Sequence, residues 1–137
     1  MEEFQYMLER LASHVRLNTP VIVAGDFNAW ATEWGSRCTN ARGRCLLETF
    51  ACLPVTLMND GRGSTFRRAE SSSIIDLSFV SDGLVPRTAW KLTEDFTNSN
   101  HQAIVMTVTG RNTRGDGVLK FTGPKWKDSR FDEETYR

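Results

Sequence analysis

The stretch VIVAGDFNAW, residues 21–30, decides how the rest of the sequence is interpreted. Positions 21–24 are apolar without alternation, which is typical of a strand buried on both faces. The run ends in a glycine followed by Asp26 and Asn28. A carboxylate at the end of a buried strand is costly unless it has a partner. The stretch therefore predicts a buried strand with a polar site at its end.

Composition limits the classes of protein to consider. The chain has 137 residues, of which 39% are hydrophobic and 25% charged, as expected for one globular domain. Lys+Arg and Asp+Glu are both 17, so the overall basic charge typical of nucleic-acid binders is missing. No apolar run is long enough to span a membrane, and the acidic, amphipathic start does not resemble a signal peptide. We therefore expect a nuclear or cytoplasmic location, no secretion and no membrane partner.

The three cysteines, Cys38, Cys45 and Cys52, follow one another at intervals of seven residues. An odd number without a signal peptide indicates reduced thiols. A zinc site would need a fourth ligand, and His14 and His101 are distant in sequence. The simpler interpretation is that the cysteines are small apolar residues near one helix face.

The order of the predicted elements, a helix followed by a turn and a buried strand, is typical of α/β folds. Short connections between later strands permit antiparallel neighbours, so we expect one sheet of about five strands with mixed pairing. A polar, glycine-containing stretch begins at residue 111 and indicates a linker. The predicted helices cover residues 2–16 and 43–52, and the predicted strands lie within residues 21–25, 54–60, 64–66, 71–81, 87–94 and 101–110.

Polar residues occur at or near the ends of three predicted strands: Asp26 with Asn28, Asp76, and Asn100 with His101. Side chains repeat every second residue along a strand, so Asn28 points to the same side as Asp26 if the strand continues. An acid and an amide can orient a water, and an acid-supported histidine can serve in proton transfer. Together they suit metal-assisted phosphodiester hydrolysis, and we expect them to converge at one end of the sheet.

Each of these residues also has a simpler interpretation. Asp26 can merely cap the following turn, because Gly-Asp-x-Asn is a common turn composition. Asp76 can have a structural role, although a carboxylate inside an apolar run is harder to explain in that way. A single histidine such as His101 at a strand start is more often structural than catalytic. The order of all three groups favours the functional interpretation.

The succession GDFNA, EWGS, STF, IIDLSFVS and SNHQAI resembles the second half of the endonuclease/exonuclease/phosphatase domain. The similarity is greatest to the apurinic-type endonuclease domains of non-LTR retrotransposons. It implies an α/β fold, a partial sandwich with a mixed sheet flanked by helices. It also implies that residues 1–110 are the C-terminal half of the domain, and that residues 111–137 are a connector towards a reverse transcriptase region.

The resemblance also implies catalytic roles and a substrate. Asp26 matches the acid that positions the attacking water, and Asn28 matches the amide that contacts the scissile phosphate. Asp76 matches the acid that pairs with the catalytic histidine, and His101 matches that histidine. The implied substrate is DNA, the implied cofactor is Mg²⁺ or Mn²⁺, and the implied activity is a nick that primes reverse transcription.

Two departures from the family pattern leave the activity open. The metal-site aspartate that precedes the family's histidine is replaced here by Asn100, which has no charge. The first half of the domain, with its metal-binding glutamate, is not matched in this sequence. The alternative is a catalytically inactive remnant that serves as an interaction or assembly module. Half of the sandwich would leave a bare apolar sheet face, so we expect a homodimer or a partner protein to cover it.

Overall fold

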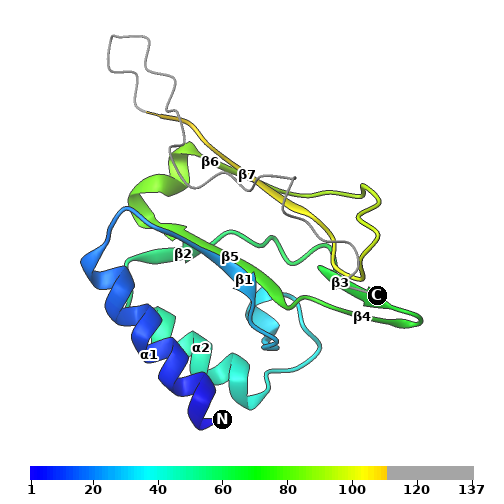
Figure 1. The fold of residues 1–137 in the computed structure, drawn as a ribbon, viewed down its shortest axis with the longest axis horizontal. Helices are drawn as coiled ribbons and strands as arrows, with labels where there is room; N and C mark the ends of the chain where they lie inside the picture. Colours follow the sequence, from blue (N-terminus) through cyan, green and yellow to red (C-terminus); the bar gives the residue numbers. More distant parts are fainter. Residues whose placement is uncertain (111–137) are drawn as a thin grey trace, which may run out of the picture.

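A computed structural model describes residues 1–110 of the chain as three layers. Two helices lie against one face of a central sheet, and a two-stranded ladder lies over the other face (Figure 1). The connector expected over residues 111–137 lies outside the described residues. The elements are α1 (Glu2–Leu17), β1 (Ile22–Asp26), the 3-10 helix η1 (Thr32–Trp34), α2 (Ala41–Ala51), β2 (Val55–Leu57), β3 (Phe66–Arg68), β4 (Ser71–Ser73), β5 (Asp76–Ser81), the 3-10 helix η2 (Asp82–Arg87), β6 (Thr88–Leu92) and β7 (Ile104–Val108).

The α/β class with flanking helices is confirmed, but the strand pairing differs from the prediction. The central sheet has three strands in the order β1-β5-β2, while β3 pairs with β4 and β6 pairs with β7. Every one of these pairings is antiparallel, so the expected mixed sheet of five strands is wrong for residues 1–110. The physical reason is that β6 and β7 pair with each other and stack on the central sheet instead of extending it.

The helices cover the sheet because each has one apolar face. The buried residues of α1 recur at helical spacing, which confirms the helix expected over residues 2–16. Met7 is apolar too, but it is 40% exposed and does not belong to this buried face. Phe27 meets the rings of Phe50 in α2 and Phe79 in β5 edge-on, at 6.3 and 6.1 Å between centroids. These rings join the helices to the strands in one core.

The strand predicted from residues 21–25 forms, but it is not buried on both faces. Val23 is buried against the helices, whereas Ile22 is 44% exposed and Ala24 is exposed. The reason is its position, because β1 is an edge strand of the sheet. The central strand is β5, and its residues 77–81 are all buried.

The expectation of a bare apolar sheet face is largely wrong. Leu77 and Phe79 belong to the core beneath the helices, so Ser78 and Val80 point to the opposite face. Both are buried, at 1% and 0% exposure, on the side of the sheet over which the β6–β7 ladder lies (Figure 1). The exposed positions of this face lie on the two edge strands, at Ile22 and Ala24 in β1 and at Thr56 in β2.

The start of α2 is fixed to the loop that follows β1. The Asn40 side-chain oxygen accepts hydrogen bonds from the Gly43 amide at 2.8 Å and from the Trp30 amide at 3.2 Å. Gly43 is needed here, because a Cβ atom at this position would lie 1.8 Å from the Trp30 carbonyl oxygen. The cap therefore places α2 and the GDFNAW loop relative to each other.

Replacing Asn40 with alanine is expected to lower the free energy of unfolding by about 1–2 kcal/mol, because the Gly43 and Trp30 amides lose their shared acceptor. Urea unfolding followed by circular dichroism measures the change. Asn40→Asp is the matched control, since aspartate caps helices as well as asparagine and should leave stability nearly unchanged. Equal losses in both variants would contradict the capping explanation.

Candidate functional site

The antiparallel register of β1 and β5 brings two carboxylates together. Asp26 and Asp76 form the last cross-strand pair of the ladder, so their side chains lie side by side on one face. Like charges in such a pair are destabilising unless another group compensates them. The Asp76 side chain is only 17% exposed, which makes a partner more necessary.

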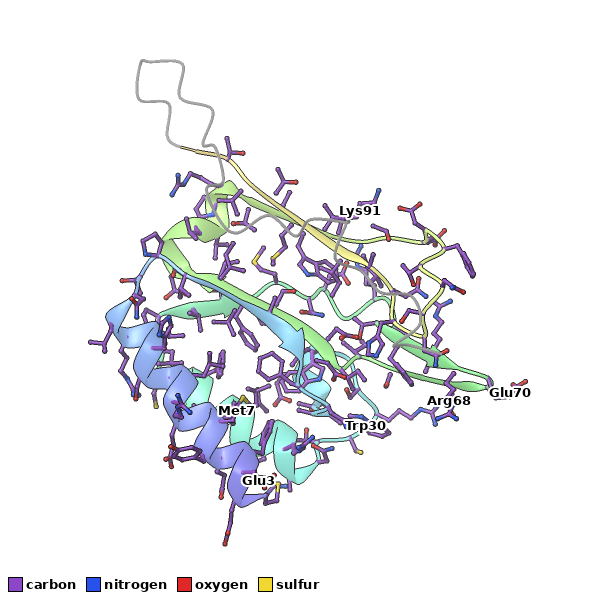
Figure 2. All side chains as sticks on the ribbon, in the orientation of Figure 1. Glu3, Met7, Trp30, Arg68, Glu70 and Lys91 are labelled. Atoms are coloured by element: carbon purple, nitrogen blue, oxygen red, sulfur yellow. The ribbon has the colours of Figure 1, made fainter. Side chains whose placement is uncertain are left out.

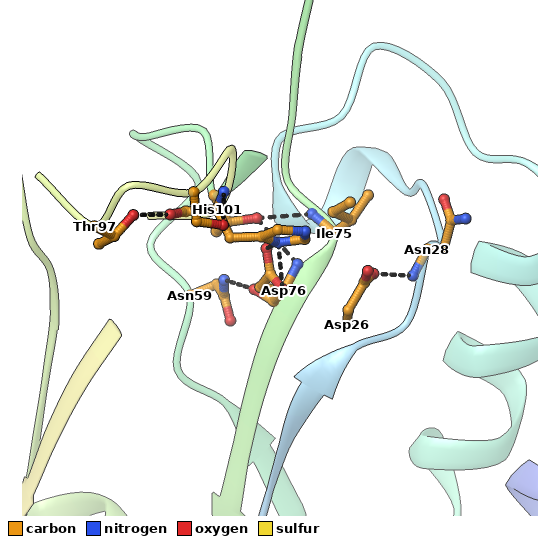
Figure 3. Close-up of polar contacts among 9 residues, drawn as sticks. Asp26, Asn28, Asn59, Ile75, Asp76, Thr97 and His101 are labelled. Atoms are coloured by element: carbon orange, nitrogen blue, oxygen red, sulfur yellow. Dashed lines mark hydrogen bonds and ion pairs between the residues drawn. The ribbon is translucent and has the colours of Figure 1, made fainter. Parts of the chain in front are cut away.

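The partner of Asp76 is His101, as the sequence predicted. Nδ1 of the imidazole lies 2.9 Å from Oδ2 and 3.1 Å from Oδ1 of the carboxylate (Figure 3). An ionised carboxylate only accepts hydrogen bonds, so Nδ1 must carry the proton. In the neutral ring this leaves Nε2 as an acceptor. The pair therefore orients His101 and selects the tautomer that can take up a proton at Nε2.

The backbone of His101 is held from several sides. It forms an isolated antiparallel bridge with Phe66, whose ring meets the imidazole edge-on at 4.9 Å between centroids. The His101 amide donates to the Ser99 hydroxyl at 3.1 Å, and the Thr97 hydroxyl donates to the His101 carbonyl at 2.8 Å. The imidazole is thus placed by the fold as well as by the bond to Asp76.

Asp26 has the capping role that its sequence context allows, and it also lies beside Asp76. Its Oδ1 accepts a hydrogen bond from the Asn28 amide at 2.9 Å, so it does cap the following turn. Asn28 has φ of 45°, in the left-handed region that asparagine tolerates better than most residues. β1 therefore ends at Asp26, and the expected continuation of the strand through Asn28 is wrong. The Asn28 side chain stands apart from the Asp76–His101 pair (Figure 3).

A cavity of about 820 Å³ opens over these groups. Asp26, Asn28 and His101 all line it, so the structure brings three of the expected site residues to one hollow. Its remaining wall comes from the GDFNAW loop, the loop before β3 and the β3–β4 hairpin, and includes Trp30, Arg37, Arg62 and Phe66. The tip of that hairpin, marked by Arg68 and Glu70, projects from the body of the molecule (Figure 2).

Asn100, the expected metal-site position, lies outside the lining of the cavity. Its side chain is exposed, and its backbone carbonyl accepts a hydrogen bond from the Arg67 amide at 2.8 Å. It precedes His101 but does not belong to the lining of the cavity.

The donor set does not fit a tight Mg²⁺ site. Within residues 1–110, one group of possible ligands is clustered, namely Asp26, Asp76 and His101, with ligand atoms within 4.8 Å of one another. Mg²⁺ prefers oxygen ligands in octahedral geometry. Both oxygens of Asp76 already face the imidazole, and one oxygen of Asp26 is bonded to the Asn28 amide. Asn100 adds no charge, so within residues 1–110 the cluster offers few carboxylate oxygens that are free of another partner.

The fold is that of the endonuclease/exonuclease/phosphatase class. Residues 1–105 match the family of endonuclease-reverse transcriptases, and the chain belongs to that family. The structure is similar to that described as "Endonuclease domain of TRAS1, a telomere-specific non-LTR retrotransposon", with a TM-score of 0.70 and 30% sequence identity. That similarity covers 77% of this chain and 49% of the other, so the chain spans about half the length of the structure it matches.

None of the curated proteins compared with the sequence matches it. Among residues 1–110, no helix combines the length and the apolar character that crossing a membrane requires.

Two polar side chains that support the site, those of Asn59 and Thr65, could not be predicted as such from the sequence. The Asn59 amide donates to the Asp76 carbonyl at 2.9 Å, and its oxygen accepts from the Ser78 amide at 2.8 Å. The Thr65 hydroxyl accepts from the amides of Ile75 and Asp76. These contacts join segments that are distant in sequence, so no periodic pattern signals them.

Proposed function

We propose that the chain is part of a DNA-nicking endonuclease domain of a non-LTR retrotransposon, and that the nick primes reverse transcription. The observation that carries this proposal is the Asp76–His101 bond next to Asp26 at the paired ends of β1 and β5. Activity on chromosomal DNA would take place in the nucleus, after synthesis in the cytoplasm.

The proposed reaction is hydrolysis of a phosphodiester. The oxygen of a water attacks phosphorus, the bond from phosphorus to the 3′ oxygen breaks, and that oxygen takes a proton to become the 3′-hydroxyl primer. In our assignment Asp26 orients the water, and Asn28 contacts the phosphate. His101, held by Asp76, stabilises the charge that develops on the phosphate oxygens or transfers a proton there.

The proposed cofactor is Mg²⁺ or Mn²⁺, which would stabilise charge on the phosphate. Because the residues described here do not fit a tight site, the main metal ligand would come from polypeptide outside residues 1–110.

The experiment that tests this function begins with the transcript upstream of Met1. If the reading frame continues and supplies a strand-ending glutamate, the extended protein is expected to nick supercoiled plasmid. His101→Ala and Asp26→Ala should each abolish that nicking. An extended protein with the glutamate and without activity would contradict the proposal.

A second candidate function is that of an inactive assembly module, which Asn100 and the exposed part of β1 favour. β1 is an edge strand, and edge strands offer unpaired backbone groups to a second chain. Ile22 adds an exposed apolar side chain on the face opposite the helices. We propose that a second copy of the chain pairs here, where a standard interface would bury roughly 800 Å² per partner.

Ile22→Lys is expected to convert such a dimer to monomer, because a charge cannot be buried there without a partner. Sedimentation velocity at several protein concentrations measures the change. Leu17→Lys is the matched control, since Leu17 is an exposed apolar residue at the end of α1 and should leave association unchanged. A parent chain that remains monomeric at high concentration would contradict the dimer.

A further inference from the structure

Thr65 contacts three segments of the chain that meet at the site. It is fully buried, at 0% exposure, and directly precedes β3. Its Oγ1 accepts hydrogen bonds from the amides of Ile75 and Asp76, each at 3.0 Å. Its own amide donates to the Ser73 carbonyl at 3.0 Å, and its carbonyl accepts from the Gln102 amide at 2.7 Å. Its hydroxyl, amide and carbonyl groups are therefore all hydrogen-bonded. They bond to Asp76 itself and to residues close to Asp76 or His101 in sequence.

The Thr65 hydroxyl provides the acceptor for two backbone amides at the start of β5. The chain leaves the β3–β4 ladder after Ser73 and joins the central sheet at Asp76. At this change of ladder, the amides of Ile75 and Asp76 donate to the Thr65 hydroxyl. Both Ile75 and Asp76 lie in a largely buried region, where an unpaired amide is costly. A threonine hydroxyl can accept two hydrogen bonds, so one side chain satisfies both amides.

The backbone carbonyl of Thr65 bonds to the segment that carries His101. Its bond to Gln102 lies next to the bridge between Phe66 and His101, and the Arg67 amide bonds to the Asn100 carbonyl on the other side of that bridge. The short extended segment 65–67 therefore holds the residues around His101 in register, while the Thr65 hydroxyl holds the start of β5. Thr65 therefore contacts both the start of β5, which carries Asp76, and the segment next to His101.

We propose that Thr65 is the positioning residue of the Asp76–His101 pair. It fixes the backbone that carries the carboxylate through its hydroxyl, and the segment that carries the imidazole through its carbonyl. The inference rests on the proposed function for its importance in catalysis. The contacts themselves can be tested without any DNA.

The decisive comparison is between Thr65→Val, which keeps the shape and removes the acceptor, and Thr65→Ser, which keeps the acceptor. In the isotope-labelled chain, NMR follows amide exchange at Ile75 and Asp76 together with the imidazole resonances of His101. Thr65→Val is expected to speed exchange at both amides roughly tenfold, the effect of losing one hydrogen bond. It should also remove the hydrogen-bonded Nδ1 proton signal of His101. Thr65→Ser should retain both features of the parent chain.

Thr93→Val is the matched control for a threonine buried elsewhere. Thr93 is 7% exposed, and its hydroxyl has no hydrogen-bond partner within the part of the chain that the structure describes. The same substitution there removes no bond to the backbone of β5. It is expected to leave the exchange at Ile75 and Asp76 and the His101 signals as they are in the parent chain.

Three results would overturn the inference: unchanged His101 signals in Thr65→Val, loss of those signals in Thr65→Ser, or an equal loss in Thr93→Val. If Thr65→Val does not fold, Thr65→Ser decides the matter on its own. The outcome is separable from that of the proposed function, because these resonances report the pair whether or not the protein nicks DNA. If the NMR results support the role of Thr65 but the extended protein is inactive, only the proposed activity is refuted.

Discussion

Supercoiled plasmid incubated with the purified 137-residue chain and Mg²⁺ is expected to remain supercoiled. The Asp76–His101 pair is formed, but the clustered ligands within residues 1–110 do not fit a tight Mg²⁺ site. A metal in such chemistry stabilises developing charge by several kcal/mol, and about 1.4 kcal/mol corresponds to tenfold in rate. The expected loss is therefore several orders of magnitude. Agarose gel analysis of relaxed and linear plasmid over a long incubation measures it.

The variant Asn100→Asp tests whether one added carboxylate is enough for activity. It places a negative charge directly before His101 but adds only one carboxylate, so it alone is expected to leave the chain inactive. His101→Ala protein, purified in parallel, controls for a contaminating nuclease. Nicking by the parent chain that disappears in His101→Ala would contradict the prediction and would show that the described residues are sufficient for activity.

Trp34→Ala is expected to lower the free energy of unfolding by about 3–5 kcal/mol, a large share of the stability of a small domain. Trp34 is 1% exposed and belongs to the main core. Its indole Nε1 also donates to the Ala29 carbonyl at 3.2 Å, which ties the core to the loop that follows Asp26. Truncation would leave both a cavity and an unpaired carbonyl. Urea unfolding followed by circular dichroism measures the loss.

Trp30→Ala is the matched control for this substitution. Trp30 lies in the same loop, but its side chain is 37% exposed and lines the cavity (Figure 2). Removing it should cost less than about 1 kcal/mol, in the range of partly exposed residues. If the two variants lost equal stability, burial would not be the reason for the effect of Trp34→Ala.

The elements of the fold could be predicted where apolar periodicity is strong. α1 was predicted because its apolar residues follow one helix face, and β5 because its residues are apolar on both faces. The pairing could not be predicted in the same way. The edge position of β1 and the stacking of the β6–β7 ladder depend on contacts between distant segments. The serine and isoleucine residues 71–75 also appear continuous with β5, although the chain changes its pairing partner between Ser73 and Asp76.

The candidate site was predictable from the order of its motifs, and the pairing of Asp76 with His101 is confirmed. The position of Asn28 was predicted wrongly, because a strand pattern does not reveal that asparagine adopts a left-handed conformation. Thr65 and Asn59 act through a hydroxyl and an amide on the backbone of another segment. Such bonds leave no repeating signal in a sequence.

The side chain of Asn59 has a consequence for the chemical ageing of the protein. Its amide nitrogen donates to the Asp76 carbonyl, and its oxygen accepts from the Ser78 amide, so it acts as one more residue of β2. Deamidation to aspartate would replace the donor with a second acceptor and set a carboxylate against that carbonyl. A single spontaneous hydrolysis would then loosen the strand that carries Asp76. The age of a preparation thus becomes a variable in any measurement made on the Asp76–His101 pair.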